Sequence, residues 1–204
     1  FAGTVQASGE WPLDPPGAFP VDGMTVAQIA REDIASRTIL LGEKRRLALD
    51  VTIPPNGYQA DIWRGLSLVN LGDADPEADI RSVEIWRDGG NGRFDGGLPD
   101  DISLGKAQWR DGRWELGTFW RALPTTGLRI YASVDVDTLA TPDRTIRLAI
   151  PVNGIVVESD NDGPIDGDAP NGGTLVIAAT PSEVILASAE AQSGASLLPG
   201  GAPE

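Results

Sequence analysis

The chain has 204 residues, and its 16 Lys and Arg against 30 Asp and Glu give it a net charge of −14 at pH 7. A surface with this charge repels nucleic acid and anionic lipid and attracts cations. The sequence contains neither histidine nor cysteine, which excludes Ser-His-Asp and Cys-His catalysis, imidazole and thiolate zinc sites and disulfide bonds, and leaves carboxylate-based enzymes and hard-cation sites open.

Residues 1–35 are predicted to form an extended arm with one short helix. The segment 1–23 contains many Gly and Pro and has no sustained hydrophobic period. Thr25 and Gln28 have the spacing of a capping box at the start of a helix. The apolar face of that helix would consist of Val26, Ile29, Ala30 and Ile34.

Apolar side chains recur at every second position from residue 38 onward, which is the pattern of half-buried β-strands. In the run 45–53, the core-facing residues would be Leu47, Leu49, Val51 and Ile53. Further strand-length runs, separated by turn-forming residues, follow at 65–72, 79–88, 128–137, 144–150, 154–159 and 173–180. Because no helical pattern alternates with these strands, we expect an all-β fold, a two-sheet antiparallel β-sandwich over residues 36–180.

A further strand and a Gly/Pro-rich tail are predicted at residues 181–204. The run 174–189 is too apolar to remain exposed, so we expect it to pair with its own sheet or with a neighbouring molecule. The sequence has no apolar run of about eighteen residues, so we expect no membrane span. It begins at Phe1, which fits removal of an export signal or trimming, and we expect a secreted or cell-surface protein.

Acidic residues gather in three turns. Calcium takes about six to eight oxygens, and Asp or Asn at every second or third position lets one loop wrap the ion. We therefore expect calcium at two turns, with ligands Asp88, Asn91, Asp95 and Asp101 in the first and Asp160, Asp162, Asp166 and Asp168 in the second. The alternative is that Asp, Asn and Gly are simply the residues of ordinary turns. The third turn, residues 70–79, is expected to be an ordinary solvated turn.

The stretch DIRSVEIWRDGGNGRFD at 79–95, followed by RIYASVDVD, TIRLAI and VESDNDGP, resembles an Ig-like β-sandwich module of exported bacterial surface proteins. In such modules a strand ending in YRD or WRD runs into a D-x-N-G-D-G-x-F-D turn, and a later NDGP closes the domain; this chain has a shorter loop, with Gly90 at a position where an acidic ligand would be convenient. The match covers residues 40–165. The resemblance implies an Ig-like sandwich, a surface location and a structural role, and it implies no catalytic residues.

Four of the six tryptophans lie within residues 86–120. Trp86 is predicted on the solvent side of its strand, so Trp86 and Trp109 would form an exposed platform if the protein bound carbohydrate. The alternative is that tryptophans fill the core, and the strand parity of Trp114 predicts a core position for that residue.

We expect a non-enzymatic extracellular structural protein, the subunit of a surface assembly or pilus-like filament. Its partners would be copies of itself joined by β-strand addition, with residues 1–20 completing the sheet of a neighbour. Two alternatives stay open: a carbohydrate-binding module that contacts surface glycans, and a carboxylate-dependent hydrolase. The hydrolase would need two carboxyl groups that face each other across a cleft, for which the candidates are Glu84, Glu115 and Glu158.

Overall fold

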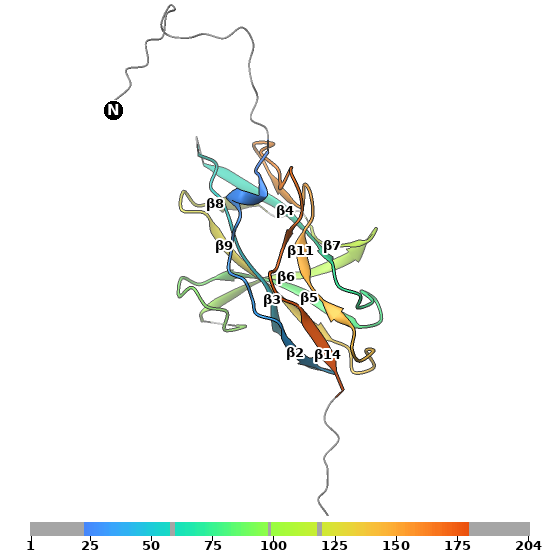
Figure 1. The fold of residues 1–204 in the computed structure, drawn as a ribbon. Helices are drawn as coiled ribbons and strands as arrows, with labels where there is room; N and C mark the ends of the chain where they lie inside the picture. The colour runs from blue at the N-terminus through green and yellow to red at the C-terminus, as the bar shows by residue number, and fades with distance from the viewer. Residues whose placement is uncertain (1–22, 58–59, 98, 118–119, 180–204) are drawn as a thin grey trace, which may run out of the picture.

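The computed structural model describes residues 23–57, 60–97, 99–117 and 120–179, and these residues form an all-β fold (Figure 1). The all-β prediction is therefore confirmed. The predicted donor segment 1–20 and the predicted tail 181–204 lie outside the described residues.

The larger sheet is one continuous path of antiparallel strands. Its order is β1 (Ala30–Arg31), β3 (Arg46–Ile53), β9 (Leu128–Val136), β5 (Ile80–Asp88), β6 (Asp101–Arg110), β7 (Arg113–Leu116), β4 (Asp61–Asn70), β11 (Leu148–Ile150) and β13 (Ala169–Pro170). Two short strands, β8 (Arg121–Leu123) and β12 (Ile155–Val157), also pair with β4. A smaller sheet has the order β10 (Thr145–Ile146), β14 (Leu175–Ala178) and β2 (Arg37–Leu40), and its β14–β2 pair is parallel.

The long strand β6 joins the two halves of the larger sheet. Its first part pairs with β5, and its last residues, 108–110, pair with β7. Gly105 lies where the β5–β6 register shifts, and its φ of +130° is a conformation that other residues rarely adopt. The sheet therefore curls around a core instead of lying flat, and the expected arrangement of two separate Ig-like sheets is not confirmed.

A single cluster of buried apolar side chains lies inside the curled sheet. Both halves contribute to it, with Trp63, Leu68 and Leu148 from one and Ile53 and Ile85 from the other, each essentially inaccessible to water. Leu49, Val51 and Ile53 of β3 are buried as predicted, but Ala48 and Asp50, predicted on the opposite face, are buried as well. Leu47 is only half-buried, and the register with β9 shifts between Leu47 and Leu49.

The predicted short helix is instead a single 3₁₀ turn, η1 (Val26–Gln28). Its capping box is present, because the Gln28 Oε1 accepts a hydrogen bond from the Thr25 amide at 2.7 Å. The chain then becomes extended and forms β1 along β3, so the helical prediction beyond Gln28 is wrong. Met24 and Ile29 are buried in the core, so the folded body begins by residue 24.

The two edge strands of the larger sheet, β1 and β13, are joined by side chains. The Arg31 guanidinium donates to the Pro170 carbonyl at 3.0 Å. The Asn171 side chain accepts from the Ile34 amide at 2.9 Å and donates to the Ile34 carbonyl at 3.1 Å. These contacts cover both edges, which are otherwise sites of unwanted pairing.

The chain enters the folded body near η1 and leaves it after β14, and these two elements lie toward opposite ends of the body (Figure 1). The apolar run 174–189 is paired with its own molecule over Leu175–Ala178, where β14 lies between β10 and β2. The rest of that run falls outside the described residues from position 180 onward. No helix in the described part of the chain has the length and apolar character needed to cross a membrane.

Candidate functional site

The acidic loop between β5 and β6 is organised around Asp101, whose side chain is completely buried. Its Oδ2 accepts hydrogen bonds from the backbone amides of Asp95 at 2.5 Å and Gly96 at 2.8 Å. The Asp95 carboxylate in turn accepts from the Asn91 side chain at 2.7 Å. Three of the predicted calcium ligands are therefore brought together, but two of their carboxylates already bind N–H donors of the loop.

Asp88 closes the other side of this loop. It pairs with Asp101 across the β5–β6 ladder, and its Oδ1 accepts from the amides of Gly90 at 3.0 Å and Gly92 at 3.2 Å. Both glycines have positive φ, which lets the loop turn sharply enough to present its amides to one carboxylate. The acidic side chains of the loop thus hold its backbone in place by accepting hydrogen bonds from its own amides.

Aromatic packing fixes the loop to the outer face of the sheet. The Phe94 ring lies 5.9 Å from the Trp86 ring and 5.4 Å from the Tyr131 ring. Trp86 is only 3% exposed and donates its indole N–H to the Ser133 hydroxyl at 2.9 Å. The prediction that Trp86 lies on an exposed platform is therefore wrong, because the following loop folds back over it.

Two polar atoms buried beneath the loop have no hydrogen-bond partner among the described residues: the Oδ1 of Asp101 and the hydroxyl of Tyr131. Burial raises the pKa of Tyr131 well above its ordinary value. Beside it, Arg129 donates two hydrogen bonds to Asp50, at 2.9 and 2.8 Å, and this contact raises the pKa of the Arg129 guanidinium. A carboxylate oxygen buried without a donor is the one feature of the loop that fits a bound cation.

In the second acidic loop, between β12 and β13, the carboxylates hold different segments in place. The Asp162 Oδ1 accepts from the Val157 amide at 2.7 Å, and the Asp166 Oδ1 accepts from the Val26 amide at 2.7 Å. The Asp168 Oδ1 accepts from the amide of residue 152 at 3.1 Å, and Asp160 lies at a positive φ of 60°. These oxygens do not converge, so the loop does not fit the predicted calcium shell.

The third acidic turn, residues 70–79, is tied down by hydrogen bonds. Asp79 is 2% exposed and accepts from the amides of Asp75 and Thr141, each at 2.7 Å. Hydrogen bonds from the Thr145 side chain and amide lower the pKa of Asp73, and the amides of residues 78 and 77 lower that of Asp75. The turn is therefore a structural connection, and its prediction as simply solvated is wrong for Asp79.

Across all described ranges, no group of three or more Asp or Glu side chains is placed to hold a metal ion.

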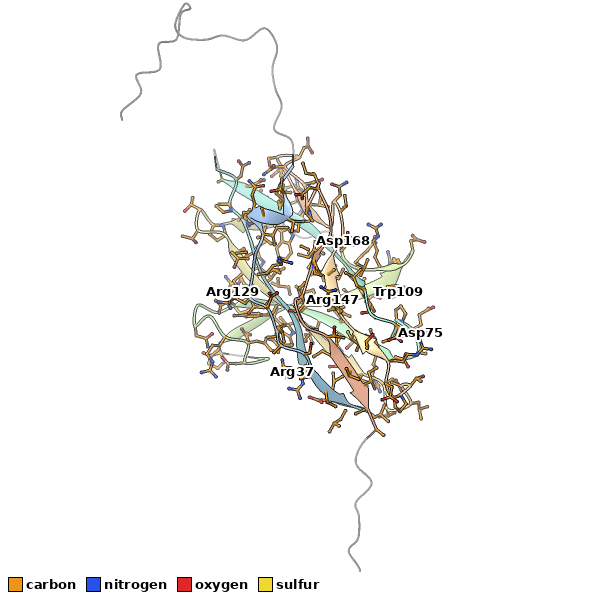
Figure 2. All side chains as sticks on the ribbon, viewed as in Figure 1. Arg37, Asp75, Trp109, Arg129, Arg147 and Asp168 are labelled. Carbon is orange, nitrogen blue, oxygen red and sulfur yellow. The ribbon has the colours of Figure 1, made fainter. Side chains whose placement is uncertain are left out.

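A groove of about 350 Å³ lies beside the β6–β7 hairpin. Trp109 and Trp114 line it with their rings 4.6 Å apart, and Trp114 is buried, as its strand parity predicts. Arg129 lies over the ring of Tyr131, and Tyr131 pairs with Trp86 across the β5–β9 ladder, so Arg129 marks the side where Trp86 is buried. Figure 2 shows Trp109 on the opposite side of the body from Arg129. Trp86 and Trp109 therefore do not form one carbohydrate platform.

The glutamates considered for hydrolysis line neither this groove nor the basic groove described next. Glu84 accepts a hydrogen bond from the Ser103 hydroxyl at 2.6 Å. Glu158 forms a salt bridge of 2.7 Å with Arg64. Glu115 lies on β7 opposite residue 108 of β6. They occupy separate positions on the sheet.

A second groove, of about 370 Å³, is basic. We name it the basic groove, and its lining residues are Arg37, Glu43, Lys44, Arg45, Arg46, Leu47 and Phe94. It concentrates four cationic side chains in a chain whose net charge is −14. Sequence reasoning missed it, although the run Lys44–Arg46 was a visible signal, because Arg37 joins that run only through the fold.

Comparison with protein-family models, with curated proteins and with solved structures gives no match for this chain. The resemblance to Ig-like surface modules therefore stays at the level of short motifs. Those motifs occupy the end of β5 with its acidic loop and the connection that follows β12. Any function must be argued from the geometry of the fold itself.

Proposed function

We propose that this protein is a non-enzymatic structural subunit of an extracellular surface assembly or pilus-like filament, joined to its copies by β-strand addition. The observation that carries this proposal is the placement of the chain: it enters the body near η1, and β2, an edge strand, lies beside β14 toward the other end (Figure 1). A subunit that donates a strand at one end and accepts one at the other forms an open, repeating chain.

Protection of the other edges supports this proposal. The edges β1 and β13 of the larger sheet are covered by the Arg31 and Asn171 contacts. β10 is covered because the Thr145 amide and hydroxyl donate to Asp73 at 2.7 and 2.6 Å. β2 pairs with no further strand on its outer side in the described part of the chain, and Glu43 covers only its end, where the Leu40 amide donates to the Glu43 Oε2 at 2.9 Å and the Leu40 carbonyl accepts from the Glu43 amide at 3.0 Å. An edge that stays open at Thr38, in a protein that covers its other edges, favours a partner strand.

The proposal includes a secreted or cell-surface location and an Ig-like two-layered arrangement in which β6 would belong to both layers. Its support is the motif resemblance, together with the position of the WRD motif at the end of β5. The absence of cysteine is compatible with this location, because the extensive buried core replaces disulfides as the source of stability.

The purified 204-residue chain is expected to form filaments or other high-mass species. Strand addition supplies backbone hydrogen bonds along a whole edge, so assembly should depend on protein concentration. Electron micrographs and light scattering over a concentration series test this. Single particles at all concentrations, with constant mass, would rule out the proposed function.

Calcium is proposed only for the first acidic loop, where the buried Asp101 oxygen lacks a donor. We expect millimolar Ca²⁺ to raise the melting temperature, and a chelator to reverse the effect. The gain in free energy of unfolding would be about 2.7 kcal/mol when calcium is a hundredfold above its dissociation constant. Differential scanning fluorimetry measures it.

The matched variants for calcium are Asp101→Asn and Asp166→Asn, one from each of the first two loops. Asp101→Asn should abolish the calcium-dependent shift, whereas Asp166→Asn should leave it intact because that carboxylate holds the Val26 amide. A shift that is absent in the native chain, or that persists in Asp101→Asn, would refute the calcium site.

A further inference from the structure

The outer edge of β2 is open for backbone pairing at Thr38, whereas the Leu40 amide and carbonyl already bond to Glu43 at 2.9 and 3.0 Å. The amides of Arg37 and Leu41 donate to the carbonyls of Thr174 and Ala178, each at 3.1 Å, which directs alternate residues of β2 toward β14. The intervening residue Thr38 therefore presents its N–H and carbonyl on the opposite side. Thr38 is exposed.

The basic groove lies directly beside this edge. Arg37 comes from β2 itself, and its guanidinium donates to the carbonyl of Leu47 on β3 at 3.5 Å, so both strands line the groove. Of its cations, Arg46 forms a salt bridge with Glu43, while Lys44 is exposed. The surface next to β2 is thus locally positive on a strongly acidic protein.

We infer that the edge of β2 and the basic groove together accept residues 1–20 of a second copy of this chain. This inference rests on the proposed function and identifies the surface that accepts the donated strand. Residues 1–20 contain Glu10 and Asp14 and no Lys or Arg, so their charge complements the groove. Their first eight residues alternate, with Phe1, Gly3, Val5 and Ala7 in one set and Ala2, Thr4, Gln6 and Ser8 in the other, as a strand with one apolar face requires.

The ends of the body also favour a second copy as the source of the strand. Residues 1–20 join the body near η1, whereas β2 lies toward the opposite end (Figure 1). Addition between copies then repeats in one direction and makes a heterologous, head-to-tail contact, which leads to an open filament. β14, the last described strand, lies beside β2 of its own molecule.

Because the chain has no cysteine, the contact can be tested by cross-linking the full 204-residue chain. The double variant Val5→Cys with Thr38→Cys should give, on mild oxidation, a ladder of covalent multimers in a non-reducing gel. The matched control is Val5→Cys with Gln108→Cys, because Gln108 is also exposed on a strand but lies at the Trp109 groove. An oxidised product that stays monomeric, or an equal ladder in the control, would overturn the inference.

Charge reversal gives a second test that needs no cross-link. Arg37→Glu with Lys44→Glu should raise the protein concentration needed for assembly by about tenfold or more. The control Arg81→Glu with Arg110→Glu makes the same change in net charge at exposed sites elsewhere and should leave it unchanged. If the native chain assembles and both charge variants assemble equally well, the acceptor assignment fails while the proposed function stands. If the native chain never assembles, the proposed function fails with it.

Discussion

The Asp61→Ala variant is expected to have a free energy of unfolding about 2–4 kcal/mol below that of the native chain. Asp61 begins β4 and is 4% exposed. Its Oδ1 accepts from the amides of Ile62 at 2.8 Å and Ser159 at 3.2 Å, and its Oδ2 accepts from the Ser159 hydroxyl at 2.5 Å and the Asn56 side chain at 3.3 Å. Alanine removes every one of these acceptors, and the hydrogen bonds from the Ile62 and Ser159 amides and the Ser159 hydroxyl to this side chain are lost.

The effect of Asp61 should depend on pH. Burial opposes ionisation of its carboxyl, but the hydrogen bonds from Ser159, Ile62 and Asn56 outweigh burial and lower its pKa. Because the folded pKa lies below the unfolded value of about 3.9, this stabilisation is present above that pH and is lost as pH falls through the folded pKa. The difference between native and Asp61→Ala should therefore shrink in acid.

Urea unfolding of both proteins at neutral pH and at about pH 3 measures this difference. Comparing the two proteins at each pH removes the contributions of Asp73 and Asp75, whose pKa values are also lowered. Asp61→Asn, which keeps one side-chain acceptor, is the matched control and should lose less stability than Asp61→Ala. A difference that is the same at both pH values would contradict the role given to the ionised carboxylate.

The strands could be predicted because the pleat of a β-strand imposes a period of two on the sequence. Leu49, Val51 and Ile53 are buried on one side of β3 as that period requires. Trp86 shows the limit of the same argument. Its side of the strand was predicted correctly, but that side is covered by Phe94 from the loop that follows, and periodicity does not reveal which loop folds over which face.

The acidic loops show why a calcium site is difficult to predict from sequence alone. An Asp carboxylate satisfies either a cation or a backbone N–H, and both choices favour the same short, Gly-containing sequences. The Asp166 carboxylate accepts a hydrogen bond from the Val26 amide, 140 positions away along the chain, and no local sequence pattern indicates a partner at that distance. The basic groove escaped prediction for the same reason, since Arg37 meets Lys44–Arg46 only after β2 and β3 are in place.

Removal of residues 1–20 is expected to abolish assembly while the body stays folded. The shortened chain keeps Met24, whose amide donates to the Asp162 carbonyl at 2.9 Å and whose carbonyl accepts from Ile165 at 2.9 Å. It also keeps η1 and β1, so every core contact described above is retained. The edge of β2 remains but has no donor, and light scattering should report a constant monomer mass at concentrations where the native chain assembles.

A chain with residues 1–20 in scrambled order is the control that separates the effect of the sequence pattern from the effect of segment length, charge and composition. It has the same length, charge and composition as the native chain, but the alternation of Phe1, Val5 and Ala7 is lost. If β-strand addition joins the subunits, the scrambled chain should assemble as poorly as the shortened one, because an added strand must present one apolar face in register. Filaments from the shortened chain would show that the subunits are joined through the body alone. If the scrambled chain forms filaments and the shortened chain does not, the acidic charge of residues 1–20, rather than a paired strand, joins one subunit to the next.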